Sequence, residues 1–173
     1  MKIGIVVEAI FLFSAFVEYI IVWVEIDQSG KVEWTQKPTV LALANGTRFS
    51  IFISAKDKRI LLKKLEQDKP ERSRTMQRLL VFATLLFLLL KVHIDKLDQV
   101  IVDDEYQGHS PTIKEHMLNL FRRYKKRIDP QIFVFQRIGK RSPAHDLAIN
   151  VFRGTVPANR KLSVSEVLAE FRK

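Results

Sequence analysis

The sequence predicts an α/β protein with a mixed sheet, in which an antiparallel β-meander is followed by the order β-α-β-α. Three observations lead to this prediction. The first third is rich in β-branched and aromatic residues and contains Asn45-Gly46, a strong two-residue hairpin signal. Helical patterns begin only after residue 54. From residue 97 onward a strand pattern and a helix pattern alternate twice, which places helices on the faces of a sheet.

Strands are predicted wherever the N-terminal region combines apolar and β-forming residues. The expected strands are 2–13, 17–26, 39–44 and 47–54, with further extended structure over 31–35. Between them, Asp27-Gln28-Ser29-Gly30 has the composition of a turn. If the first strand of the meander is 17–26, residues 1–16 form an additional N-terminal element.

Two helices are predicted after the meander. Residues 55–68 alternate apolar and charged residues at helical spacing, and Pro70 with Glu71 is typical of a first turn. The second helix is expected to run to about Val92. Its centre is apolar on all sides, which predicts burial between two layers.

The remaining elements follow from turn and capping signals. Ser110-Pro111 suits the cap and first residue of a helix, and Ser163 with Glu166 forms a capping box. The predicted elements are a strand over 97–103, a helix from 110, a strand over 131–136, a helix over 143–152, a linker over 154–160 and a last helix. The chain is expected to be a single domain, with 155–173 as a helical extension.

Membrane insertion is not expected. Glu8, Glu18 and Glu25 interrupt the apolar N-terminal stretch, and each would cost roughly 2–3 kcal/mol near the bilayer centre. The apolar run over 79–90 is too short to span a bilayer. The chain has no cysteine, which excludes disulfides and thiolate metal sites and favours a cytoplasmic location.

The net charge of +10 is concentrated in the last third of the chain. Residues 110–173 hold 14 Lys and Arg against 5 Asp and Glu, whereas residues 1–109 hold 15 against 14. Such asymmetry favours nucleic acid as a partner, although a solvated lysine-rich surface would have the same composition. The basic helix end over 122–127, with Arg122, Arg123 and Lys126, is one candidate contact surface.

An apolar strand pattern ends in three carboxylates, Asp103, Asp104 and Glu105. In an extended strand Asp103 and Glu105 point to one side and Asp104 to the other, so the first two could share one ion. Oxygen ligands favour Mg²⁺ or Mn²⁺. The alternative is that these acids pair with Lys or Arg, or cap the loop that leads to Ser110.

A second polar segment opens the helix predicted over 143–152. His145 and Asp146 lie in its first turn, and a basic loop precedes it. In that loop Arg137, Lys140 and Arg141 are candidate phosphate ligands. The alternatives are a surface histidine, an aspartate that only stabilises the helix dipole, and an ordinary basic turn.

The element order and these two segments resemble the ribonuclease H-like fold over about residues 18–153. Acids of that family typically lie on the first strand, at the end of the fourth strand and on the last core helix. The resemblance implies Asp103 or Glu105 for the fourth-strand acid. It implies His145 or Asp146 for the helix, and Asp27 or Glu8 for the first strand.

The resemblance implies a divalent-metal-dependent nuclease. In two-metal hydrolysis, ions roughly 3.5–4 Å apart activate a water and stabilise the leaving oxygen, and His145 could protonate the leaving group. Mg²⁺ or Mn²⁺ is the expected cofactor. One alternative is a non-catalytic nucleic-acid-binding protein on the same fold. Another is an oligomeric scaffold in which the apolar N-terminal region pairs with a second copy.

Overall fold

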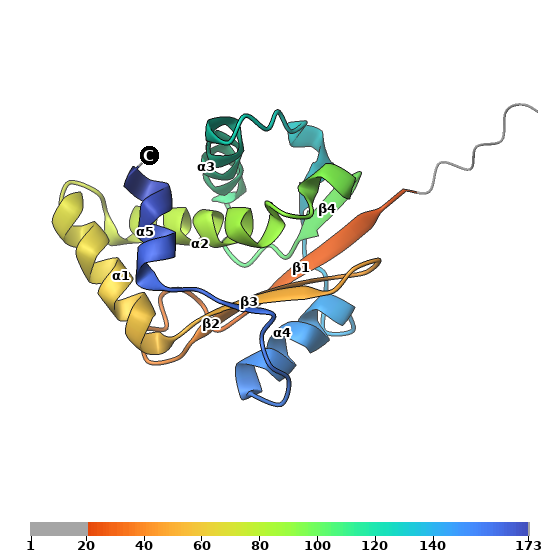
Figure 1. Ribbon diagram of the computed structural model, residues 1–173, viewed down its shortest axis with the longest axis horizontal. Helices are drawn as coiled ribbons and strands as arrows, with labels where there is room; N and C mark the ends of the chain where they lie inside the picture. Colours follow the sequence, from red (N-terminus) through yellow and green to blue (C-terminus); the bar gives the residue numbers. More distant parts are fainter. Residues whose placement is uncertain (1–20, 173) are drawn as a thin grey trace, which may run out of the picture.

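The computed structural model describes residues 21–172, which form a six-stranded mixed sheet and five α-helices (Figure 1). The strands are β1 (Trp23–Ser29), β2 (Thr39–Ala44), β3 (Phe49–Ile53), β4 (Gln99–Val102), β5 (Phe133–Phe135) and β6 (Arg160–Lys161). The helices are α1 (Ala55–Asp68), α2 (Arg74–Leu90), α3 (Ser110–Arg123), α4 (Pro143–Arg153) and α5 (Val164–Arg172). The predicted strand 2–13, Glu8 and residues 17–20 lie outside the described residues.

The sheet has the order β5-β4-β1-β2-β3-β6. Strands β1, β2 and β3 pair antiparallel as a meander, while β4 pairs parallel with β1 and β5 parallel with β4. The prediction of an α/β protein with a mixed sheet is therefore confirmed. Ile26 of β1 lies beside Val102 of the parallel strand β4, so the residues that follow these two positions meet at the same end of the sheet.

Helices cover both faces of the sheet. The alternation of side chains along β2 separates two apolar cores: Leu41 and Leu43 face α2, whereas Val40 and Ala42 pack with residues of α4. Figure 1 shows α4 on one side of the sheet and α1, α2, α3 and α5 on the other. This position of α4 brings its first turn close to β1.

Helix α2 is the centre of the larger core. Every residue from Leu79 to Leu90 is buried, as its all-round apolar composition predicts. The helix begins later than predicted, because the Ser73 hydroxyl accepts the backbone N–H of Met76 and caps the helix there. Pro70 lies in the turn before that cap. Among residues 21–172, no helix combines the length and apolar character that crossing a membrane requires.

The segment between β1 and β2 differs from the prediction. Strand β1 continues to Ser29, through the predicted turn, because its pairing with β2 extends to the register pair Ser29 and Val40. The chain then reverses at Gly30, which has φ +76°. Residues 31–35 form turns instead of extended structure, with Trp34 N donating to Lys31 O at 3.0 Å. Pairing with β2 thus overrides the local turn composition.

The remaining elements match their predictions more closely. Helix α1 has the predicted bounds, and the hairpin turn holds both Asn45 and Gly46 at positive φ. Strands β4 and β5 are shorter than predicted, and His109 occupies the cap position of α3 in place of Ser110. The predicted linker ends in β6. Ser163 and Glu166 form the predicted capping box, with Ser163 N donating to Glu166 Oε2 at 2.8 Å.

Lys58, in the first turn of α1, fastens the segment between β1 and β2. Its side chain is completely buried. The ammonium donates to the carbonyl of Lys31 at 2.9 Å and to the hydroxyl of Thr39 at 2.8 Å. Burial lowers the pKa of Lys58 from 10.5 to about 8.

Lys58→Met is expected to flatten the pH dependence of stability between pH 8 and 10.5. In this range the unfolded wild-type chain keeps the Lys58 proton, whereas the folded protein releases it, so wild-type stability rises with pH by about 2 kcal/mol from this group. Urea unfolding of both proteins across this range measures the difference, and all other groups cancel. Parallel curves would show that Lys58 keeps an ordinary pKa in the folded protein.

Candidate functional site

Three carboxylates meet where β1 and β4 end. Asp27 is the fifth residue of β1, and Asp103 and Glu105 follow β4. The register of the two strands places them together, with Asp103 N donating to the carbonyl of Ile26 at 2.9 Å. One carboxylate oxygen from each acid lies within 4.8 Å of the others. Asp27 is buried, and the other two are half-buried.

The acids that follow β4 point to two different sides of the chain, as the alternation of side chains predicts. Asp103 and Glu105 face Asp27, although the regular strand ends at Val102. Asp104 points elsewhere, and its Oδ1 accepts the hydroxyl of Ser110 at 3.1 Å. The loop-capping alternative therefore applies to Asp104. For its two neighbours the ion-binding interpretation stands beside the pairing alternative, because Glu105 contacts Lys31 at 2.9 Å.

Helix α4 adds a histidine to the acids. His145 Nδ1 lies 2.7 Å from Asp27 Oδ2. The position of the helix is set by its cap, because the Ser142 hydroxyl accepts Ala144 N at 3.1 Å and donates to Glu25 Oε2 at 2.5 Å. Glu25 and Asp27 are two residues apart on β1, so both point toward α4. The role of Glu25 was not predicted; its spacing from Asp27 is the only signal for it.

The environment of Asp27 shifts the pKa of its carboxyl upward. Burial raises the pKa of this carboxyl, and the charge of Asp103 adds to the increase. The hydrogen bonds from His145 and from the backbone at Gln28 act in the opposite direction and are outweighed. A neighbouring positive charge would therefore stabilise the ionised form of Asp27.

Lys31 is a member of the site that the sequence did not indicate. Its ammonium lies 2.9 Å from Glu105 Oε2, and this contact raises the pKa of Lys31. Lys31 reaches Glu105 because Gly30 reverses the chain immediately after β1. No spacing rule connects residues 74 positions apart, so only the folded structure reveals the pair.

The basic loop after β5 borders the acids. Asp103 Oδ1 accepts the backbone N–H of Ile138 at 2.9 Å, which fastens the loop to the site. Arg137 and Lys140 line a pocket of about 360 Å³ together with the three acids and His145. Arg141 is exposed and does not line this pocket. Two cations therefore stand beside three carboxylates.

The other predicted site residues lie elsewhere. Asp146 is exposed, and it belongs to neither the carboxylate group nor the pocket. Arg122, Arg123 and Lys126 are at the far end of α3, whose 14 residues separate them from Ser110 by about 20 Å. Lys126 forms an ion pair with Asp95 there. Glu8 is outside the described residues.

Asp27, Asp103 and Glu105 could hold one hard divalent cation, since oxygen atoms from all three converge on one small volume. Lys31 already neutralises part of the charge on Glu105, and His145 Nδ1 lies against Asp27 Oδ2. The described residues offer this convergent set for one ion, flanked by an ammonium and an imidazole. No protein-family model, curated protein or solved structure matches the chain.

Proposed function

We propose that the protein is a divalent-metal-dependent nuclease that hydrolyses nucleic-acid phosphodiesters. The observation that carries this proposal is the convergence of Asp27, Asp103 and Glu105 from two neighbouring strands. Carboxylates from separate segments suit an ion that must also leave room for a phosphate. The cations of Arg137 and Lys140 in the same pocket suit the phosphate itself.

The arrangement of the elements supports a ribonuclease H-like core. Asp27 lies on the first strand of the meander, Asp103 follows the fourth strand, and His145 opens α4. These are the three places where the resemblance expects site residues. His145 takes the helix position in this proposal, because it contacts Asp27 whereas Asp146 is exposed and lies outside the carboxylate group. Two helices, α1 and α2, connect the meander to β4.

Each residue has a distinct role in this proposal. Asp27, Asp103 and Glu105 hold one Mg²⁺ or Mn²⁺, which when bound polarises a phosphoryl oxygen and activates a water. Arg137 and Lys140 orient the phosphate. His145 and Lys31 hold Asp27 and Glu105 in position through contacts of 2.7 and 2.9 Å.

The raised pKa of Asp27 makes metal binding dependent on pH. A cation binds the deprotonated carboxyl, and the raised pKa of Asp27 means that deprotonation requires a higher pH than for an ordinary aspartate. Affinity for Mn²⁺ therefore increases with pH through the Asp27 pKa.

Cleavage assays on duplex, single-stranded, hybrid and branched substrates test the proposal. We expect cleavage with Mg²⁺ or Mn²⁺ and none with EDTA. Asp103→Asn should lower the rate at least about a thousandfold, because one of three metal ligands loses its charge. Asp146→Asn is the matched control: it makes the same chemical change one residue from His145 and should cleave at the wild-type rate. Equal rates for Asp103→Asn and wild type would refute the assigned site.

A second function is supported by the contacts of the acids. Lys31 and His145 pair with Glu105 and Asp27, so an ion-pair network could stabilise these carboxylates without a metal. The protein would then bind nucleic acid without cleaving it. This function predicts salt-dependent binding in EDTA that Asp103→Asn leaves unchanged.

A further inference from the structure

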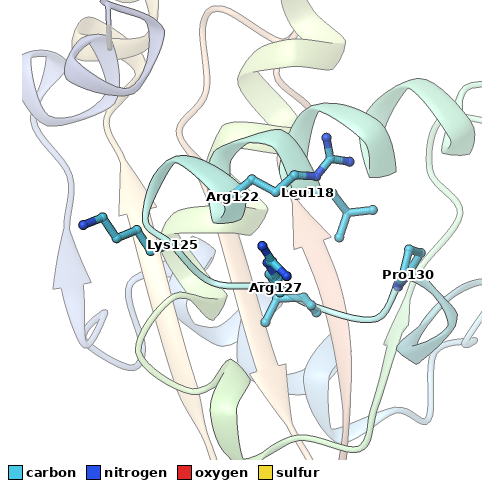
Figure 2. Close-up of a pocket in the computed structure, with 6 residues that line it drawn as sticks. Leu118, Arg122, Lys125, Arg127 and Pro130 are labelled. Carbon is cyan, nitrogen blue, oxygen red and sulfur yellow. The ribbon is translucent and has the colours of Figure 1, made fainter.

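A second pocket lies at the C-terminal end of α3, away from the acids. Its volume is about 760 Å³, larger than the 360 Å³ pocket at the acids. Figure 2 shows the residues that line it. We call it the α3-end pocket; its lining residues are Leu118, Arg122, Lys125, Arg127, Ile128 and Pro130. Half of these residues are cations, half are apolar, and none is an acid. The pocket therefore suits an anion that also carries an apolar surface.

The cations of the α3-end pocket are not neutralised by the protein. Within residues 21–172, no carboxylate lies within 4.0 Å of Arg122, Lys125 or Arg127. The neighbouring Lys126 is paired with Asp95 and does not line the pocket. Arg122 donates only to the neutral side chain of Asn119, at 2.6 Å, so its charge is not compensated. Three cations without a carboxylate partner line one hollow, and they produce a positive potential that an anion would relieve.

The backbone holds one of these cations at a position that usually carries glycine. Helix α3 ends in a Schellman motif, in which Lys126 N donates to Phe121 O at 3.0 Å and Lys125 N donates to Arg122 O at 2.9 Å. Lys125 occupies the left-handed position with φ +58°. A β-carbon is unfavourable there, so the lysine is retained at a conformational cost.

One side of α3 connects the α3-end pocket with the acidic site. Lys114, Leu118 and Arg122 are spaced four residues apart, so they form a stripe along the helix. Leu118 and Arg122 line the pocket, and Lys114 donates to the carbonyl of Phe133 in β5 at 3.0 Å. The other end of α3 meets the acid-bearing loop through Ser110 and Asp104. The stripe covers about 12 Å of the helix axis, and the whole of α3 is about 20 Å long, which equals about six base pairs at a rise of 3.4 Å.

We infer that the α3-end pocket binds backbone phosphates of a nucleic acid, about six base pairs from the phosphodiester that lies at Asp103. This inference rests on the proposed function and adds that the substrate is a polymer long enough to occupy both places. Arg122 and Arg127 suit phosphate because guanidinium groups bind its oxygens through two parallel hydrogen bonds. The apolar side chains of Leu118, Ile128 and Pro130 suit van der Waals contact with a sugar or a base.

Fluorescence anisotropy in EDTA tests the pocket independently of catalysis. The probes are labelled duplexes of 4, 8 and 16 base pairs. The charge-reversal variant is Arg122→Glu/Arg127→Glu, and the control is Lys56→Glu/Lys63→Glu, which makes the same charge change on exposed residues of α1. We expect the first variant to bind the 16-mer at least tenfold more weakly and to reduce the salt slope by about 2, with a much smaller effect in the control.

The length of the duplex and a variant at the backbone position of Lys125 complete the test. In wild type the 16-mer should bind more tightly than the 4-mer by more than the statistical gain in sites, and Arg122→Glu/Arg127→Glu should remove that excess. Lys125→Gly should weaken binding without lowering the melting temperature, because glycine suits the left-handed position. Equal losses in both charge-reversal variants would overturn the inference. Displacement of the duplex by equimolar poly-glutamate would also overturn it, because the pocket would then be an acidic-peptide site.

Failure of the proposed nuclease function would give a different result. Wild type would bind the 16-mer in EDTA through the α3-end pocket, yet no substrate would be cleaved with Mg²⁺ or Mn²⁺. If cleavage occurs and Arg122→Glu/Arg127→Glu leaves both its rate and its length dependence unchanged, the α3-end pocket is not part of the substrate path and the inference is wrong.

Discussion

Asp103→Asn is expected to stabilise the metal-free protein and to abolish its stabilisation by Mg²⁺ or Mn²⁺. Two carboxylate charges within 4.8 Å of each other repel by at least about 3.5 kcal/mol at an effective dielectric constant of 20. Lys31, paired with Glu105 at 2.9 Å, offsets part of this repulsion, so the net gain should be about 1 kcal/mol. The asparagine oxygen can still accept the backbone N–H of Ile138, as Asp103 Oδ1 does at 2.9 Å.

The same substitution removes a ligand from the proposed ion. A cation at a hundred times its dissociation constant stabilises a folded protein by about 2.7 kcal/mol, and the variant should lose nearly all of this. Thermal unfolding with and without Mn²⁺ measures both effects. Asp146→Asn should respond to Mn²⁺ like wild type, since Asp146 is exposed and outside the carboxylate group. An unchanged response to Mn²⁺ in Asp103→Asn would place the ion elsewhere.

Gly30→Ala is expected to destabilise the protein by about 3 kcal/mol or more. Gly30 has φ +76°, a conformation that costs an alanine about 1–2 kcal/mol. Its added β-carbon would lie 2.1 Å from the carbonyl oxygen of Pro38 and 2.6 Å from Cε2 of Phe152. The first neighbour is backbone and cannot rotate away, and overpacking of this kind costs about 1–3 kcal/mol.

Gly154→Ala is the matched control for this prediction. Gly154 has φ +78°, but a β-carbon there would meet nothing within 4 Å. Gly154→Ala should lower the stability by only roughly 1–2 kcal/mol, the cost of the backbone conformation. Urea unfolding of the two variants separates the steric contribution from the conformational one. Similar losses in both variants would show that the turn at Gly30 relaxes away from Pro38 and Phe152.

Gly30→Ala should also disturb the acidic site. Phe152 belongs to α4, which presents His145 to Asp27, and Lys31 follows Gly30 directly. We therefore expect a weaker Mn²⁺ response in Gly30→Ala than in Gly154→Ala. The turn at Gly30 serves the site by holding two segments close to the end of β1.

The fold was largely predictable because its local signals agree with its packing. Helix α1, the hairpin at Asn45-Gly46 and the capping box at Ser163 each depend on residues only a few positions apart. The apolar centre of α2 predicted its burial for the same reason. Two predictions were wrong for different reasons. The segment over 31–35 is held by a distant partner, Lys58, whereas the start of α2 was placed at Pro70 because the local cap at Ser73 was not recognised.

In the candidate site, too, some features follow from local sequence and others depend on distant segments. Sequence alternation predicted that Asp103 and Glu105 share a side and that Asp104 does not, and the two acids do face Asp27 together although the regular strand ends at Val102. Only the tertiary structure decided that Asp27 joins them, that α4 presents His145 instead of Asp146, and that Lys31 reaches Glu105. Those three facts depend on strand register, on the rotation of a helix against the sheet and on a chain reversal. Each is set by packing between segments far apart in the sequence, and no local pattern encodes it.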